Sequence, residues 1–325
     1  MSKPRVFVTR TILPEGLKKI SEFCDMNLWS GDLPPQRDEL LEYVAGVEGI
    51  LSLVTDRMDG ELMDAAGPQL KVISNYAVGY DNIDVPAATA RGIAIGNTPG
   101  VLTDATADFA FTLLLAAARR VVEADRHVRQ GQWKTWGPSI LLGASLYGTT
   151  LGLVGFGRIG QAVAKRAAGF DMRILFYDPA LPDDFKWGNA QRVDFETLLS
   201  ESDLISLHTP LTPQTHHLIN EHAFSLMKPD AVLVNTARGP VVDPQALYQA
   251  LKEKRILAAA LDVTEPEPLP VNSPLLCLDN LIIAPHIASG SYVSREQMSI
   301  IAADNLIAGL KGERLPHCVN PQVYG

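Results

Sequence analysis

The chain has 325 residues, of which 46% are hydrophobic and 20% are charged, and its formal net charge is −9. This length suits two domains, and the composition is that of a globular protein with a substantial core. The negative charge argues against nucleic acid as the main partner, because phosphate binding requires a positive surface. The apolar stretches are short or interrupted by polar residues, which argues against a membrane partner.

The number and spacing of the cysteines indicate the cellular compartment. Cys24, Cys277 and Cys318 are few and widely spaced, with no CxxC or metal-binding spacing. We expect them to be reduced thiols. The N-terminal residues MSKPRVFVTR lead directly into a strand-like run, without the apolar stretch of a secretory signal. Together these features predict a cytoplasmic protein.

The first hundred residues alternate between strand-like and helix-like patterns. Strands are expected over residues 5–9, 26–29, 49–54, 72–76 and 93–96, with helices near 15–23, 37–47, 60–66 and 86–91. This alternation predicts a parallel sheet with helices on both faces. One long helix is expected next, from about Thr103 to Gln130. Its nearly continuous apolar section, residues 109–118, suggests that it is buried.

A second α/β series follows in mid-chain. Its strands are expected over residues 151–155, 173–177, 204–208, 231–235, 258–262 and 281–284, and a final helix over 294–311. Six strands with a glycine-rich first turn fit a doubly wound nucleotide-binding domain. The expected fold is therefore α/β with two doubly wound parallel sheets. A Rossmann cofactor domain, residues 102–289, is inserted into a flavodoxin-like substrate domain made of residues 1–101 and 290–325.

The first turn of the second series carries a nucleotide-binding pattern. The apolar run 151–154 leads into the letters GFGRIG at residues 155–160, and a helical pattern follows. Gly155 permits a tight turn, Gly157 lets a pyrophosphate approach the backbone, and Gly160 lets the helix pack closely on the strand. Asp178 lies 18 residues after Gly160, at the end of the next strand, where a carboxylate can bind an adenosine ribose. The pattern predicts that the chain binds a dinucleotide.

Three later strand ends carry ionisable residues, in the position where open α/β sheets place their sites. Arg238 follows strand 231–235 and is suited either to hold a carboxylate or to form a surface ion pair. Asp262 and Glu267 lie in the acidic, proline-rich loop after strand 258–262, where solvated acids are the simpler interpretation. His286 follows Pro285 and an apolar run, a position that is more often structural than catalytic.

The residues of these three segments indicate one type of reaction when they are considered together. An enzyme that transfers a hydride to a carbonyl must hold the substrate anion, supply one proton and orient the proton donor. Arg238, His286 and Glu267 offer these three abilities on strand ends of one nucleotide-binding fold. A glutamate beside the histidine would stabilise the imidazolium that protonates the product alkoxide. The combination predicts a keto-acid reductase.

Over essentially its whole length the chain resembles the D-2-hydroxyacid dehydrogenase family. The matching motifs are GLVGFGRIG at 152–160, VNTARG at 234–239, LDVTEPEP at 261–268 and PHI at 285–287. Within the family it is most similar to the glyoxylate/hydroxypyruvate reductases, through NYAVGYDNID at 75–84, ARGIAIGNTPGVLTDATAD at 90–108, GQWKTWGP at 131–138 and EPEPLPVNSPLL at 265–276. The resemblance implies reduction of glyoxylate to glycolate and of hydroxypyruvate to D-glycerate.

The resemblance also implies roles for individual residues. Arg238 would bind the substrate carboxylate, His286 would be the general acid/base, and Glu267 would be its partner. The substrate-binding residues implied are Leu53, Ala77, Val78, Gly79, Arg238, His286 and Trp136. The cofactor-binding residues implied are Thr106, Gly155, Gly157, Arg158, Ile159, Gly160, Asp178, His208, Thr209, Pro210, Thr215, Thr236, Ala237, Arg238, Asp262, His286 and Ser289. Asp262 would face the nicotinamide amide, and Trp136 would either reach the site of a neighbouring subunit or be a core or interface residue. No metal site is expected.

Several alternatives concern the cofactor, the substrate and the class of protein. Asp178 favours NAD(H), because a 2′-phosphate would meet a carboxylate, although Lys186 and Arg192 could soften this preference towards NADP(H). Another 2-keto acid such as 2-ketogluconate, or phosphite, is an alternative substrate.

Glu267 argues against a formate dehydrogenase, which pairs the histidine with glutamine, and the length argues against a phosphoglycerate dehydrogenase with a regulatory domain. A corepressor-like NAD-sensing protein is the alternative outside enzymes. The resemblance also implies a homodimer.

Overall fold

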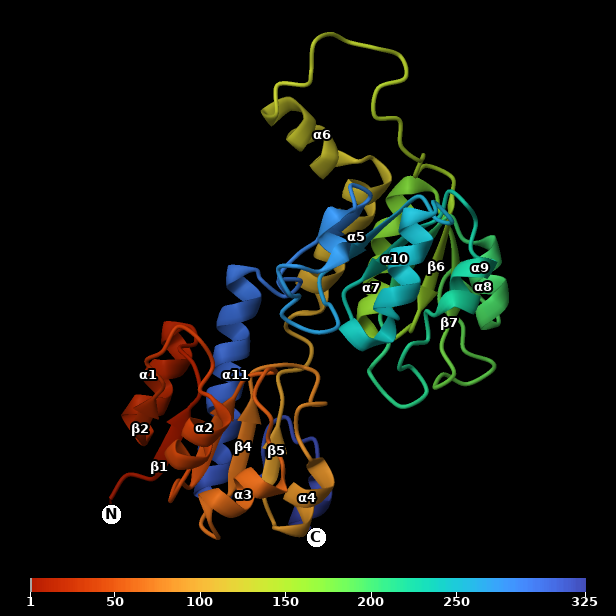
Figure 1. Ribbon diagram of the computed structural model, residues 1–325. Coiled ribbons are helices and arrows are strands. Elements are labelled where there is room, and N and C mark those ends of the chain that lie inside the picture. The colour runs from red at the N-terminus through yellow and green to blue at the C-terminus, as the bar shows by residue number, and fades with distance from the viewer. Residues whose placement is uncertain (1) are drawn as a thin grey trace. The chain divides into compact units, whose positions relative to one another are not determined.

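The computed structural model describes residues 2–325 and divides into two compact units. One unit runs to Leu102 and resumes at Ser291, and the other spans Thr103–Gly290. Figure 1 shows both units, with the helices and many of the strands labelled. No helix within residues 2–325 has both the length and the apolar character to cross a membrane.

The first unit contains a parallel five-stranded sheet in the order β2-β1-β3-β4-β5. Its strands are β1 Arg5–Val8, β2 Asp25–Leu28, β3 Gly49–Ser52, β4 Val72–Asn75 and β5 Ala94–Gly96. Its helices are α1 Pro14–Phe23, α2 Arg37–Tyr43, α3 Gly60–Ala66, α4 Val85–Ala90 and α11 Tyr292–Lys311, with a 3₁₀ turn η4 at Pro321–Tyr324. This strand order is the flavodoxin-like one predicted from the sequence.

The C-terminal helix α11 packs on α1 and on strands β3 and β4 of this first unit (Figure 1). The approach to α1 is close because a glycine faces it: a Cβ on Gly16 would collide with the backbone carbonyl of Ser299. On the sheet side, a Cβ on Gly309 would collide with the side chain of Val72. The last helix therefore completes the unit in which the chain began, and the second unit is an insertion.

The second unit contains a parallel seven-stranded sheet in the order β12-β11-β10-β9-β6-β7-β8. Its strands are β6 Thr150–Val154, β7 Arg173–Tyr177, β8 Gln191–Arg192, β9 Leu204–Leu207, β10 Val232–Asn235, β11 Ala258–Leu261 and β12 Leu281–Ile283. Its helices are α5 Thr103–Ala118, α6 Val121–Arg129, α7 Arg158–Ala167, α8 Phe195–Glu201, α9 Glu221–Leu226 and α10 Pro244–Lys252, with 3₁₀ turns η1 Ala168–Phe170, η2 Gly239–Val241 and η3 Pro274–Cys277. The order reverses between β6 and β9, as in a Rossmann domain.

Both faces of this seven-stranded sheet are buried, which explains its nearly continuous apolar strands. In β10, Val232 and Val234 join a core cluster that includes residues of α5 and α7. Leu233, between them, joins the cluster on the opposite face, with residues of α8, α9 and α10. Each such side chain contributes about 1.5–3 kcal/mol on burial, so these two clusters account for much of the unit's stability.

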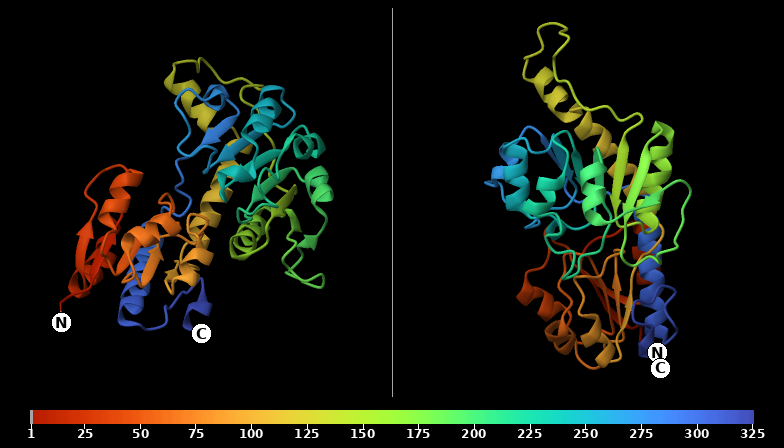
Figure 2. Two further views of the ribbon diagram at one scale, coloured as in Figure 1. Left: turned by 60° about the horizontal axis from the view of Figure 1, so that its bottom comes forward. Right: turned by 90° about the vertical axis from the view of Figure 1, so that its right-hand side faces the viewer.

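The prediction of one helix from Thr103 to Gln130 is wrong. The structure has α5, which ends at Ala118, and α6, which begins at Val121. Arg120 between them is in the left-handed region, with φ of 52°, and this interrupts the helical hydrogen bonds. The Arg120 guanidinium instead bonds Glu123 and the carbonyl of Leu142. As a result α6 and the loop after it form an arm that extends from the rest of its unit (Figure 2, right).

Candidate active site

The turn after β6 has the geometry that a bound pyrophosphate requires. Gly155 has φ of 89°, and a Cβ on it would lie 2.6 Å from the backbone of His208. A Cβ on Gly160 would collide with the carbonyl of Gly155, whereas one on Gly157 would meet only open space. Helix α7 begins at Arg158 without a side-chain cap, so its first N–H groups are available to an anion. The turn therefore fits a dinucleotide phosphate.

Asp178 is held against this turn by the backbone. Its Oδ2 accepts a hydrogen bond from the N–H of Phe156 at 2.8 Å, and its Oδ1 accepts one from the N–H of Ala180 at 2.9 Å. Each carboxylate oxygen can accept a further bond, so a ribose hydroxyl can still bind here. Arg192 is engaged with the Asp183 carboxylate and with the carbonyls of Pro182 and Asp178. This arginine, which could have attracted a 2′-phosphate, thus already has acceptors.

The other residues predicted to line the cofactor lie on α5 and on the loops after β9, β10 and β12. Thr106 is buried on α5, and the Thr215 hydroxyl donates to the carbonyl of Pro210 at 2.6 Å. The Nε2 of His208 lies 2.9 Å from the hydroxyl of Ser206, and burial lowers the pKa of His208 to about 3, so this ring is neutral. The remaining predicted residues of these loops are Thr209, Thr236, Ala237 and Ser289, all partly buried.

His286 and Glu267 meet although they are 19 residues apart. The Nδ1 of His286 lies 2.6 Å from Oε1 of Glu267. The backbone N–H of Thr264 lies 3.4 Å from the other carboxylate oxygen. Burial alone would raise the pKa of Glu267, but the hydrogen bond and the charge of His286, with a smaller contribution from Arg238, outweigh it and lower the pKa. The glutamate is therefore an anion that can stabilise an imidazolium.

Asp262 fixes the backbone of the histidine segment. Its two carboxylate oxygens accept hydrogen bonds from the N–H groups of Ile287 and Ala288, each at 2.7 Å. Its carbonyl accepts the N–H of His286 at 2.8 Å. His286 has φ of 57°, a left-handed conformation that costs a non-glycine residue about 1–2 kcal/mol. Asp262 thus holds His286 in a conformation it would not otherwise adopt, and its predicted nicotinamide contact stays a prediction.

Arg238 follows β10 on a short loop that is tied to its strand. Asn235 accepts the N–H of Ala237 at 3.0 Å and donates its amide to the carbonyl of Arg238 at 2.8 Å. A Cβ on Gly239 would collide with the carbonyl of Thr264, so this loop lies directly against the one that carries Glu267. The positive charge of Arg238 also makes a small contribution to the lowered pKa of Glu267. The second unit therefore brings a cation, an anion and an imidazole together.

In the first unit, the predicted carboxylate-binding loop has its three carbonyls bonded to interior donors. The carbonyl of Ala77 accepts the N–H of Thr98, that of Val78 the amide of Asn97, and that of Gly79 the amide of Asn75, at 2.9, 2.8 and 2.9 Å. Because the C=O and the following N–H of a trans peptide point in opposite directions, the N–H groups of Val78 and Gly79 are directed away from these donors. This arrangement suits an anion cradle.

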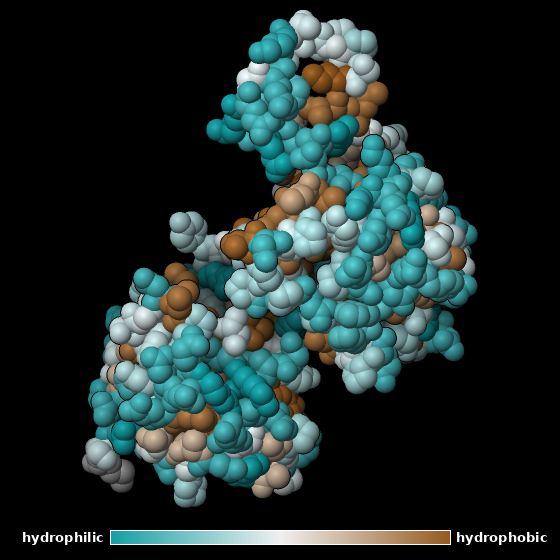
Figure 3. All heavy atoms as spheres, in the orientation of Figure 1, coloured by the Kyte–Doolittle hydropathy of each residue, from teal (hydrophilic) through white to brown (hydrophobic). Residues whose placement is uncertain are grey.

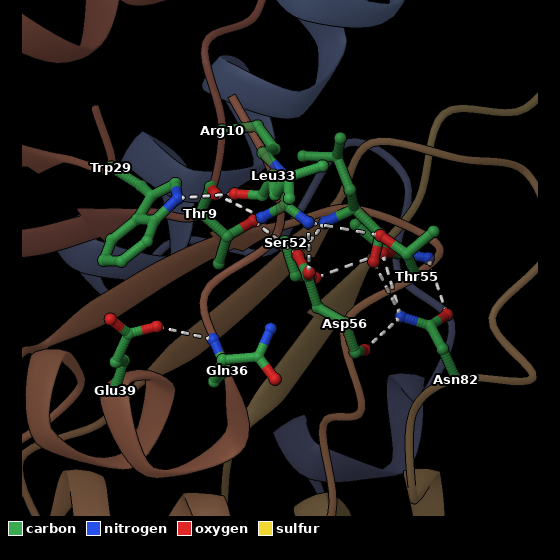
Figure 4. Close-up of polar contacts among 12 residues, drawn as sticks. Thr9, Arg10, Trp29, Leu33, Gln36, Glu39, Ser52, Thr55, Asp56 and Asn82 are labelled. Atoms are coloured by element: carbon green, nitrogen blue, oxygen red, sulfur yellow. Dashed lines mark hydrogen bonds and ion pairs between the residues drawn. The ribbon is translucent and has the colours of Figure 1, made fainter. Parts of the chain in front are cut away.

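A buried carboxylate that the sequence did not reveal organises the neighbouring loop, which contains Leu53. Asp56 is 3% exposed and accepts hydrogen bonds from the N–H of Leu53 at 2.8 Å and from the hydroxyl of Thr9 at 2.5 Å. It also forms an ion pair with Arg10 at 3.2 Å. The amide of Asn82 bonds the carbonyls of Leu53 and Asp56. Figure 4 shows these side chains converging on Asp56.

Comparisons with known proteins agree with this geometry. Residues 111–288 match the family model described as D-isomer specific 2-hydroxyacid dehydrogenase, NAD binding domain. A glyoxylate reductase of Korarchaeum cryptofilum is 54% identical over 99% of this chain and 97% of its own length. The crystal structure of the TT0316 protein of Thermus thermophilus is 48% identical with a TM-score of 0.91, covering 97% of this chain and 99% of that one.

An NADPH-dependent glyoxylate/hydroxypyruvate reductase of Sinorhizobium meliloti, solved with NADP and malonate, is also similar, at 33% identity and a TM-score of 0.84 over 99% of this chain and 98% of that one. The chain is therefore an enzyme with a nicotinamide cofactor, and it belongs to the D-isomer specific 2-hydroxyacid dehydrogenase family.

Proposed function

We propose that the enzyme reduces glyoxylate to glycolate and hydroxypyruvate to D-glycerate, with NADH as the preferred cofactor. The observation that carries the proposal is the His286–Glu267 pair, with 2.6 Å between Nδ1 and Oε1, on a unit built to bind a dinucleotide. Relatives at about half identity that are named glyoxylate reductases support the choice of substrate.

Each polar group in the site has a task in this reaction. When bound beside the substrate, NADH would supply the hydride that reduces the carbonyl carbon to the alkoxide level. The imidazolium of His286 donates a proton to the keto oxygen as the negative charge develops, and Glu267 stabilises the imidazolium until then. Arg238 holds the substrate carboxylate through its paired N–H groups. The N–H groups of Val78 and Gly79 form a proposed anion cradle within the first unit. Asp262 keeps His286 in position throughout.

The preference for NADH follows from the surroundings of Asp178. The 2′-phosphate of NADPH would lie beside a carboxylate that the backbone holds in place, while Arg192 is already bonded to the Asp183 carboxylate and to backbone carbonyls. The Sinorhizobium meliloti relative is NADPH-dependent, so membership of the family does not determine whether NADH or NADPH is preferred. Substituting Asp178→Ala removes the repulsion and one ribose acceptor, so the NADH:NADPH ratio of kcat/KM should fall. An unchanged ratio would overturn this role for Asp178.

Steady-state kinetics with glyoxylate, hydroxypyruvate, pyruvate and 2-ketogluconate, each with NADH and NADPH, test the proposed substrates. The proposal expects the highest kcat/KM for the two small keto acids with NADH. A much higher value for 2-ketogluconate, or for phosphite oxidation assayed in parallel, would replace the proposed substrates. Binding of NADH without turnover of any keto acid would favour a corepressor-like role.

We further propose a cytoplasmic homodimer. The arm of the second unit exposes large apolar side chains, with Trp133 60%, Trp136 78% and Leu142 65% exposed. Apolar residues also gather on the arm in Figure 3. A second copy of the chain is the proposed cover, with Trp136 directed to it. The three free thiols suit a reducing compartment. Light scattering after gel filtration should give twice the chain mass, and a monomer would contradict the proposed dimer.

A further inference from the structure

Two histidines and a carboxylate meet in the second unit, outside the predicted catalytic residues. The Nε2 of His217 lies 2.6 Å from one carboxylate oxygen of Glu265, and the Nε2 of His216 lies 4.0 Å from the other. One ligand atom from each of the three residues lies within 4.8 Å of the others. Among residues 2–325 this is the one such group of three histidine, cysteine or acidic side chains.

The backbone explains how two consecutive residues point to one place. Neighbouring side chains of an extended strand point to opposite sides. His217 has φ of 50°, in the left-handed region, which turns the chain so that the rings of His216 and His217 stack with 4.0 Å between their centroids. The N–H of His217 donates to the carbonyl of Pro240 at 2.7 Å and fixes this turn. The rings are thus held together by the backbone.

We propose that His216, His217 and Glu265 form a binding site for a divalent transition-metal ion of the Zn²⁺ class. Two imidazole nitrogens and one carboxylate oxygen are ligands that Zn²⁺ accepts, with water in the remaining position, whereas Mg²⁺ and Ca²⁺ prefer oxygen ligands alone. The Nε2 proton that the neutral His217 ring directs at Glu265 would move to Nδ1 through exchange with solvent when the ion binds, which frees Nε2 to coordinate.

The alternative is an ordinary histidine–carboxylate ion pair on the surface. Such a pair needs one histidine, and this unit contains one of that kind: His222 lies 3.7 Å from Glu196. At Glu265 a second histidine is stacked on the first and directed to the same carboxylate. The three side chains are 51%, 34% and 31% exposed, so an ion can enter from solvent without unfolding the chain. The arrangement is that of a chelate rather than of a single pair.

The proposed site connects two loops that matter to the predicted chemistry. Glu265 precedes Glu267 by two residues, and Pro240, which accepts the N–H of His217, follows Arg238 by two residues. An ion bound here would cross-link the segment 216–217 to the loop of Glu267. Binding should therefore stabilise the folded state, because a ligand that binds only the folded chain raises the unfolding temperature. This inference does not depend on the proposed substrate.

The test is calorimetric titration of the chelator-treated full-length enzyme with ZnCl₂, and with MgCl₂ for comparison. The variants are His216→Ala and Glu265→Gln, with His222→Ala as the matched control at an exposed histidine. His286→Gln separates this site from the His286–Glu267 pair. We expect one Zn²⁺ per chain and no Mg²⁺ binding, with affinity at least about tenfold lower in His216→Ala and Glu265→Gln. Affinity should be unchanged in His222→Ala and His286→Gln.

Thermal unfolding provides a second readout. Zn²⁺ should raise the unfolding temperature of the wild type and of His222→Ala, and should raise it much less in His216→Ala. His216 is exposed, so its replacement should leave the fold intact, which circular dichroism checks. Absence of micromolar Zn²⁺ binding to the wild type would overturn the proposal. Unchanged Zn²⁺ affinity in His216→Ala, or loss of binding in His286→Gln alone, would also overturn it.

Discussion

The charge of Glu267 can be removed while its shape is kept. In Glu267→Gln the amide oxygen can still accept the Nδ1–H of His286, whose present partner oxygen lies at 2.6 Å. A hydrogen bond to a charged group contributes about 1.5–3 kcal/mol and a neutral one about 0.5–1.5 kcal/mol. The imidazolium would therefore lose on the order of 1 kcal/mol of stabilisation. This value is at the low end of the difference between the charged and the neutral hydrogen bond, because both side chains are about one third exposed and water screens the pair.

This loss predicts a defect in kcat. The form of His286 that donates the proton loses about 1 kcal/mol of stabilisation, which is roughly fivefold in an equilibrium constant. Reduction of a keto acid by Glu267→Gln should therefore be up to about fivefold slower in kcat.

The assay is kcat for glyoxylate reduction by the wild type and the variant at one fixed pH. Glu196→Gln, beside the exposed His222, is the matched control and should behave as the wild type. NADH affinity, measured by fluorescence, should not change in either variant. Full activity of Glu267→Gln would remove Glu267 from the mechanism, and an equal loss in Glu196→Gln would show that the effect is not specific to the His286–Glu267 pair.

Three further predictions follow from the same geometry. His286→Gln should lower kcat by about 10²- to 10⁴-fold with NADH affinity unchanged, and normal turnover would exclude His286 as the acid. Asn97→Ala removes the hydrogen bond to the carbonyl of Val78. It should raise KM for the keto acid about threefold to tenfold, the effect expected from the net free energy of one hydrogen bond, and leave NADH affinity unchanged. An unchanged KM would exclude this loop from the substrate site. Because burial lowers the pKa of His208 from 6.5 to about 3, the unfolded chain alone takes up a proton below pH 6.5, and stability should fall by at most about 1.4 kcal/mol per pH unit. Urea unfolding should show a smaller acid loss in His208→Gln, and equal losses would refute this origin.

The fold could be predicted because the signals that define it are local and repeated. Apolar runs ending in glycine or polar residues mark parallel strands, and they recur at the spacing of strand–helix units. The break at Arg120 could not be predicted in this way, because it contains no glycine or proline. It depends on contacts of the Arg120 guanidinium with Glu123 and with the distant carbonyl of Leu142. The two-residue strand β8 was missed because its pattern is too short to detect.

The candidate site could be predicted in part for a similar reason. Strand ends are visible in the sequence, so Arg238 and His286 could be found as residues that follow apolar runs. Asp56 could not, because a lone acid in a loop is solvated by default, and its burial depends on Thr9 and Arg10, more than 40 residues away. The group of His216, His217 and Glu265 could not be predicted either, because the stacking of the two histidines depends on the left-handed conformation of His217.

Asp262 shows how stability and function differ at this site. Burial raises its pKa, although hydrogen bonds from Ile287 and Ala288 oppose the increase. An acid whose pKa is higher in the folded state loses stabilising free energy as pH rises from its ordinary value of 3.8 through its folded value, so ionised Asp262 destabilises the fold near neutral pH. The chain also holds His286 in a left-handed conformation at this point. A neutral asparagine would avoid the cost of the buried charge, but it has an NH₂ donor in place of one of the two oxygens that accept the Ile287 and Ala288 N–H groups. The cost in stability is thus explained by the fixed position that Asp262 gives to His286 beside Glu267.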